Sequence, residues 1–149
     1  MERSGAISFP FEVFEGERPD FFIRHGKEQF GIEVTEAADP DEQAKWTKEA
    51  KDDRASAEPV PRLVGEEACH NPEKVRDIVG KAVSRKAGRA NYTPCDLLVY
   101  LNTHADWFLE GEELFDLLSE IELETCPFPR VYVYKPDTLL ELVSETIHA

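Results

Sequence analysis

Two carboxylates in the first third of the chain have a spacing that suits metal chemistry. Asp20 opens one predicted strand of a hairpin, and Glu33 lies in the middle of the returning strand, residues 30–35. Alternate residues of a strand share a face, so Glu33 points away from the side formed by Phe30, Ile32 and Val34. A carboxylate with apolar neighbours should not lie unpaired. Two carboxylates that converge from adjacent strands would offer Mg²⁺ the hard oxygen ligands it prefers.

The same two residues also have a simpler interpretation. Asp20 follows Pro19 and would then belong to a Pro-Asp turn, while Glu33 would pair with an arginine. The spacing alone leaves both interpretations open.

A basic helix is predicted over residues 71–92, with Asn71 as its cap and Pro72 at its first position. At about 100° per residue, Lys86 falls on the apolar side of this helix, which should face the sheet. A lysine there needs a negative partner or a path to solvent. The carboxylate pair would be such a partner; the alternative is that Lys86 reaches solvent past a helix end at Gly88.

Four further cations form a stripe on one flank of the same helix, namely Lys74, Lys81, Arg85 and Arg89. Such a stripe beside a metal site would follow the phosphates of a nucleic acid. The alternative is a solvated face that bonds to acidic neighbours.

The sequence resembles the PD-(D/E)XK nuclease superfamily, which has the restriction-endonuclease-like fold. The resemblance rests on Pro19-Asp20, on Glu33-Val34-Thr35 and on the order of the basic helix and buried strand that follow, and it covers residues 7–102. It implies that Asp20 and Glu33, with the backbone carbonyl of Val34, hold one or two Mg²⁺ or Mn²⁺ ions.

The chain departs from the motif of this superfamily at one position. The resemblance implies that a motif lysine orients the attacking water and neutralises the scissile phosphate, but Thr35 occupies this position. A threonine cannot replace an ammonium group. Some members of the superfamily supply the lysine from the next helix, which here would make Lys86, or Lys81, the catalytic cation.

The elements expected to position these residues form an α/β fold with a mixed central sheet flanked by helices, as one domain over residues 1–149. Cys95 is interpreted as a core residue, His104 as a loop histidine and Tyr132 as part of an outer strand. The predicted elements are a hairpin within residues 7–35, helices at 39–55, 71–92, 111–122 and 137–147, a loop at 56–71, and strands at 95–101 and 130–134.

The net charge of −14 is unevenly distributed, because residues 71–95 carry +4 and residues 96–149 carry −10. An acidic protein repels polyanions at long range, so contact with nucleic acid would be local and sensitive to salt. No apolar run approaches the roughly 20 residues that cross a bilayer, and the acidic N-terminus does not resemble a signal peptide. We therefore expect a soluble, cytoplasmic protein without membrane contact.

Two functions follow from these features. The first is metal-dependent hydrolysis of phosphodiester bonds by Asp20, Glu33 and Lys86, with nucleic acid held by the 71–92 helix. The second is a nuclease-fold protein without activity that binds a protein partner through its acidic surfaces. The carboxylate pair and the basic helix favour the first function, and Thr35 with the acidic C-terminal third favours the second.

Overall fold

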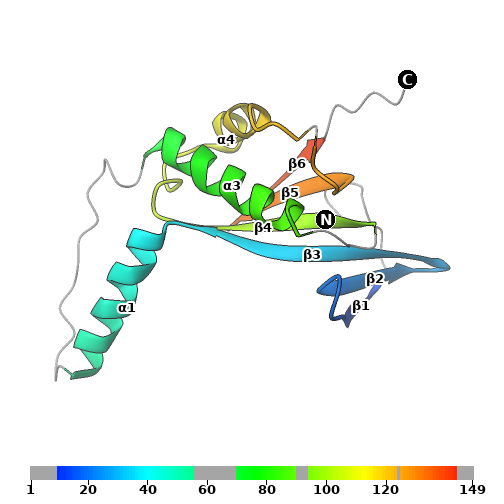
Figure 1. Ribbon diagram of the computed structural model, residues 1–149, viewed down its shortest axis with the longest axis horizontal. Helices are drawn as coiled ribbons and strands as arrows, with labels where there is room; N and C mark the ends of the chain where they lie inside the picture. The colour runs from blue at the N-terminus through cyan, green and yellow to red at the C-terminus, as the bar shows by residue number, and fades with distance from the viewer. Residues whose placement is uncertain (1–9, 56–69, 90–93, 124, 144–149) are drawn as a thin grey trace.

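A six-stranded mixed sheet forms the centre of the protein (Figure 1). The computed structural model describes residues 10–55, 70–89, 94–123 and 125–143. The strands lie in chain order across the sheet, and the pairs β3–β4 and β4–β5 are parallel while the others are antiparallel. The strands are β1 (Glu12–Glu15), β2 (Phe21–His25), β3 (Glu28–Ala38), β4 (Cys95–Asn102), β5 (Arg130–Lys135) and β6 (Thr138–Val143).

Three helices accompany this sheet in the described residues: α1 (Pro40–Ala55), α3 (Pro72–Ala87) and α4 (Gly111–Ser119). Helices α3 and α4 cover the same face of the sheet, and α1 projects away from it (Figure 1). The expected class, an α/β fold with a mixed central sheet flanked by helices, is confirmed. No helix in the described part of the chain is long and apolar enough to cross a membrane.

Helix α3 follows its sequence pattern closely. The side chain of Asn71 accepts a hydrogen bond from the Lys74 N–H, and Pro72 occupies the first turn. The helix ends at Ala87, with Gly88 as its C-cap, whereas the pattern predicted a helix to residue 92. The buried face consists of Val75, Ile78, Val79, Ala82 and Val83. These side chains pack on the main core together with Leu97 and Val99 of β4.

Two expectations for the C-terminal third are wrong. Residues 137–147 were expected to form a helix, but Thr138–Val143 is strand β6, paired with β5. Asp137 adopts a positive φ of 65° in the turn after Pro136, so the chain reverses directly into the sheet. Strand β5 consequently lies between two neighbours, and Tyr132 is fully buried rather than part of an outer strand.

The other boundaries agree more closely with the expectations. The hairpin is formed by β2 and β3, joined by a turn in which Gly26 has a φ of 61°, a conformation that favours glycine. The helix expected at 111–122 ends at Ser119. Residues 7–9, most of the 56–71 loop and the end of the 137–147 segment lie outside the described residues.

Gly31 of β3 lies against Pro19, which is fully buried. A Cβ atom on Gly31 would lie 2.3 Å from Pro19 Cγ and 3.1 Å from Cys95 Cβ. We predict that Gly31→Ala lowers the free energy of unfolding by about 1–3 kcal/mol, as overpacking does in well-packed sites. Urea denaturation measures this change.

Gly80→Ala is the matched control, because a Cβ atom at Gly80 meets nothing within 4 Å. It should stabilise α3 by up to about 1 kcal/mol through helix propensity. Equal stability of Gly31→Ala and the wild type would contradict the packing described for Pro19.

Candidate functional site

Asp20 and Glu33 lie side by side where β2 begins. The last pair between β2 and β3 is Phe21 with Ile32, so the next residues in each direction are Asp20 and Glu33. The N–H of Val34 donates a hydrogen bond of 2.7 Å to Asp20 Oδ2. The carboxylate thus extends the hydrogen bonding of β3 beyond the end of β2. Of the two interpretations left open by the spacing, the structure shows the one in which the two carboxylates converge.

Lys86 joins the two carboxylates from the last turn of α3. Its Nζ lies 2.5 Å from Glu33 Oε1 and 4.0 Å from Asp20 Oδ2. The Lys86 side chain is only 13% exposed, so it does not escape into solvent past Gly88. Of the two interpretations left open for Lys86, the structure shows the one in which it faces the sheet and meets a carboxylate partner. We refer to Asp20, Glu33 and Lys86 as the triad.

Glu33 is the most buried member of the triad, since only 6% of its side chain is exposed. Lys86 contacts Oε1, while Oε2 is buried and has no hydrogen-bond partner in the described part of the chain. A buried carboxylate oxygen without a partner is energetically costly, because it has lost water and gained nothing in return. Of the acceptors in the site, this oxygen would therefore gain most from contact with a cation or a hydrogen-bond donor.

Thr35, at the position of the motif lysine, lies next to the triad and also receives a cation from α3. Arg85 Nη2 donates to Thr35 Oγ1 over 3.0 Å and to the backbone oxygen of Glu36 over 3.1 Å. Two consecutive residues of α3, Arg85 and Lys86, thus contact the row of polar side chains on β3. Cationic groups are present at this row even though β3 itself provides none there.

The basic stripe of α3 divides into two parts. Lys74 forms an ion pair with Asp39 and lies 3.7 Å from Glu42, and Lys81 Nζ lies 2.6 Å from Asp77. The hydrogen bond to Asp39 raises the pKa of Lys74. These two lysines fit the interpretation as a solvated face bonded to acidic neighbours. Lys81 pairs with its own helix and does not join the triad.

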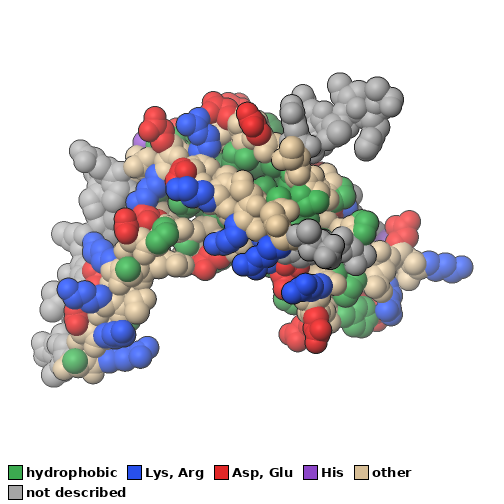
Figure 2. Space-filling model, in the orientation of Figure 1, with side chains coloured by type: hydrophobic (Ala, Val, Ile, Leu, Met, Phe, Trp, Pro, Cys, Tyr) green, Lys and Arg blue, Asp and Glu red, His purple; other side chains and the backbone are tan. Residues whose placement is uncertain are grey.

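The other part of the stripe lies at the C-terminal end of α3, where Arg85 and Arg89 are exposed. Figure 2 shows basic side chains gathered beside the C-terminal half of α3, above a hollow between α1 and the β1–β2 hairpin. Of the predicted phosphate-binding residues, Arg85 lies beside the triad, where it contacts Thr35, and Arg89 follows it as an exposed residue just after the helix.

Cys95 of β4 is a buried neighbour of the triad that sequence reasoning treated only as a core residue. It pairs with Gly31 in the parallel register between β3 and β4 and is 5% exposed. Burial raises the pKa of the Cys95 thiol, and the negative charges of Glu33 and Asp96 raise it further. The thiol is therefore a natural reporter of the charge on Glu33.

The donor set for a metal ion is small. Within the described residues, no group of three or more His, Cys, Asp or Glu side chains lies close enough together to hold a metal ion. The side-chain donors of the triad are the carboxylates of Asp20 and Glu33. The predicted backbone ligand, Val34, follows Glu33 directly on β3, and its N–H binds Asp20. Two carboxylates suffice for Mg²⁺, which usually keeps several of its water molecules.

A second polar cluster lies at the carboxyl end of β4, where the sequence suggested only a loop histidine. Glu42 Oε2 accepts hydrogen bonds from Thr103 Oγ1 over 2.8 Å and from the His104 N–H over 3.2 Å. The His104 ring makes edge contacts with Trp46 and Trp107, at centroid distances of 4.9 and 4.4 Å. Trp46 therefore packs on this loop. The signal for this cluster was the polar run 102–106 directly after a buried strand.

We predict that loss of the Lys86 ammonium destabilises the fold, because the Glu33 carboxylate would remain buried without its cation. Lys86→Met should lower the free energy of unfolding by about 3 kcal/mol, at the lower end for broken buried pairs because Asp20 is partly exposed. Lys81→Met, which removes an exposed pair, should change it by less than about 0.5 kcal/mol. Equal losses in urea denaturation would contradict the assigned role of Lys86.

We also predict that Glu33→Gln lowers the pKa of Cys95. Removal of the neighbouring negative charge makes the thiolate less unfavourable, so it forms at lower pH. Titration by NMR with ¹³Cβ-labelled cysteine resolves each thiol. Cys126 is the internal control, because burial raises its pKa and no carboxylate contributes. An unchanged Cys95 titration would show that the charge on Glu33 does not reach the thiol.

Comparison with known proteins assigns no family to the chain. No protein-family model, no curated protein and no solved structure matches it. Any function must therefore be argued from the geometry of the triad and its surroundings.

Proposed function

We propose that the protein is a metal-dependent nuclease of the PD-(D/E)XK type, in which Lys86 replaces the motif lysine. The observation that carries the proposal is the position of the Lys86 ammonium, 2.5 Å from Glu33 and 4.0 Å from Asp20. A cation on a helix, aimed at two carboxylates on adjacent strands, is the arrangement that a relocated catalytic lysine requires.

The chain order of the elements supports the proposal. Strands β1, β2 and β3 form an antiparallel meander, and α3 then leads into β4, which is parallel to β3. This is the order of carboxylate-bearing strands, basic helix and buried strand on which the resemblance to the superfamily rests. The triad lies where the first and second of these parts meet.

Asp20 and Glu33 would hold the metal ion, and Val34 would contribute its backbone carbonyl. The Val34 N–H already fixes the Asp20 carboxylate, and β3 fixes Glu33, so both ligands are positioned before any ion arrives. When bound, Mg²⁺ or Mn²⁺ lowers the pKa of a coordinated water and stabilises charge on the phosphate oxygens.

Lys86 has two tasks in this proposal. Without metal it neutralises Glu33, which is buried and needs a cation. During hydrolysis it would neutralise the scissile phosphate and orient the attacking water. Since Thr35 cannot do this, removal of the Lys86 charge should slow hydrolysis by about 10²–10³-fold, the usual effect of losing one preorganised donor.

The substrate would be held by the exposed basic residues at the C-terminal end of α3, Arg85 and Arg89. Lys74 and Lys81 already have acidic partners and contribute less. With a net charge of −14, few phosphate contacts and weak binding are expected, and added salt weakens these contacts further. Binding should therefore be measured at low ionic strength.

The alternative function, a protein-interaction module without activity, is favoured by one specific observation. Lys86 already pairs with Glu33 Oε1 when no metal ion is present, so in this alternative the triad serves stability alone. The acidic region 96–149 would then supply the binding surface.

We predict that Mn²⁺ raises the melting temperature of the wild-type protein and leaves that of Glu33→Gln unchanged. A ligand at 100 times its Kd stabilises the folded state by about 2.7 kcal/mol, and about 2–4 °C per kcal/mol is expected at this size, so the rise should be about 5–10 °C. Thermal unfolding with and without Mn²⁺ measures it.

The same preparations should then be tested for cleavage of single- and double-stranded DNA and RNA. Lys86→Gln should reduce cleavage strongly, and Lys81→Gln, its matched control on the same helix, should leave it unchanged. A wild-type protein with no shift and no cleavage in Mn²⁺ would refute the nuclease proposal and leave the interaction module.

A further inference from the structure

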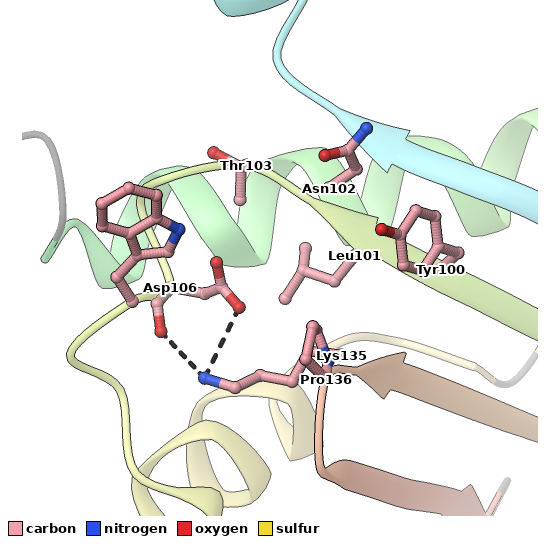
Figure 3. Close-up of a pocket in the computed structure, with 8 residues that line it drawn as sticks. Tyr100, Leu101, Asn102, Thr103, Asp106, Lys135 and Pro136 are labelled. Carbon is pink, nitrogen blue, oxygen red and sulfur yellow. Dashed lines mark hydrogen bonds and ion pairs between the residues drawn. The ribbon is translucent and has the colours of Figure 1, made fainter. Parts of the chain in front are cut away.

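A cavity of about 300 Å³ lies at the carboxyl ends of β4 and β5, distinct from the triad (Figure 3). It is lined by Tyr100, Leu101, Asn102, Thr103, Asp106, Trp107, Lys135 and Pro136. This volume is at the lower end for ligand pockets and suits a single ring system. Figure 3 shows Tyr100 and Asp106 at opposite ends of the cavity, with Lys135 and Pro136 along one side.

The two aromatic residues of the lining are exposed but held in place. Tyr100 is 39% exposed, and its ring stacks on Tyr134 at a centroid distance of 6.0 Å and an interplanar angle of 29°. Trp107 is 57% exposed, its ring makes the edge contact with His104, and its backbone N–H donates a hydrogen bond to the backbone oxygen of His104. Exposed rings with fixed orientations offer a planar ligand a surface for stacking at little cost in entropy.

The polar groups of the lining disfavour an anionic ligand. Lys135 is the one cation of this lining, and its ammonium group already contacts the Asp106 oxygen at 2.9 Å, the Leu109 oxygen at 3.0 Å and Asp106 Oδ2 at 3.5 Å. Two N–H groups of Lys135 donate to backbone oxygens, and its charge is balanced by the Asp106 carboxylate. The cavity therefore suits a neutral group rather than a phosphate.

The same lining favours a ligand rich in hydrogen-bond donors. Asp106 is buried and presents a carboxylate, with one oxygen directed to Lys135 and the other away from it (Figure 3). Asn102 Nδ2 donates a hydrogen bond to Glu36 Oε1 over 2.6 Å, and its carbonyl oxygen is a further acceptor. The lining therefore offers two acceptors to N–H donors: the Asp106 oxygen that is directed away from Lys135, and the Asn102 carbonyl oxygen.

We propose that this cavity binds an unpaired guanine base. Guanine is planar, stacks on aromatic rings, and carries N–H donors at N1 and N2 for these two acceptors. Adenine has no donor at N1 and should bind more weakly. The base can come from a free nucleoside or from a single strand, and both sources present the same edge. The inference does not depend on hydrolysis or on a metal ion.

The test is an NMR titration of ¹⁵N-labelled protein in the presence of EDTA with guanosine, adenosine and tetramethylammonium. Guanosine should shift the backbone amides of residues 101–107 in a saturable way, and adenosine should bind at least about tenfold more weakly. A parallel titration with short single strands that contain one guanine or one adenine distinguishes the two sources. Guanine-dependent shifts of these amides, caused by the nucleoside or by the single strand alone, would support guanine binding in this cavity.

Two variants make the test specific. Trp107→Leu should weaken guanosine binding about tenfold through lost stacking, while Phe108→Leu, equally exposed at 58% and outside the lining, should not change it. Asp106→Asn should abolish the preference for guanosine over adenosine, and Lys135 keeps its two backbone oxygens in this variant.

Three results would overturn the proposal. These are the absence of guanine-dependent shifts with both nucleoside and strand, equal effects of Trp107→Leu and Phe108→Leu, and tighter binding of tetramethylammonium than of guanosine. The last result would identify the cavity as a cage for an alkylated ammonium group. Because EDTA is present throughout, none of these outcomes depends on whether the triad binds Mn²⁺.

Discussion

A carboxylate that is buried on folding must be given a cation, and the need of Glu33 for one organises the first half of this protein. The antiparallel pairing of β2 and β3 places Asp20 beside Glu33, and the Val34 N–H fixes Asp20 there. The close approach of Pro19 to Gly31 is possible only because this position has no side chain. Helix α3 must then pack so that its last turn brings Lys86 to the pair.

The part of this arrangement that depends on local pattern could be predicted from the sequence. The alternation of side chains around Glu33 predicted the face of the sheet on which it lies. The N-cap and the apolar spacing of α3 predicted the side of the helix on which Lys86 lies. The bond between Arg85 and Thr35 could not be predicted, because it joins residues 50 positions apart whose side chains are both polar. The segment of strand β6 was predicted as a helix because its apolar spacing fits both the helical period and the alternation of a strand. The turn at Asp137 reverses the chain, so that the segment pairs with β5 as a strand.

The aromatic cavity was missed for a related reason. Tyr100, Trp107 and Lys135 come from three separate segments, and only the parallel pairing of β4 with β5 brings them together. In the register of the sheet, Glu33 pairs with Leu97, and Tyr100 lies three residues further along β4. At about 3.3 Å per residue, this separates the two positions by roughly 10 Å along the strand and puts them on opposite faces of the sheet. The triad and the cavity are therefore chemically independent features of one sheet.

We propose that Glu33 is an acceptor that Lys86 and a divalent metal ion share. Calorimetric titration of Mn²⁺ into the wild type and into Lys86→Gln tests this most directly, because the glutamine still donates a hydrogen bond to Glu33 but carries no charge. If the two cations compete for one carboxylate, Lys86→Gln should bind Mn²⁺ more tightly than the wild type. Binding that is absent from both proteins, or unchanged by the substitution, would contradict the account.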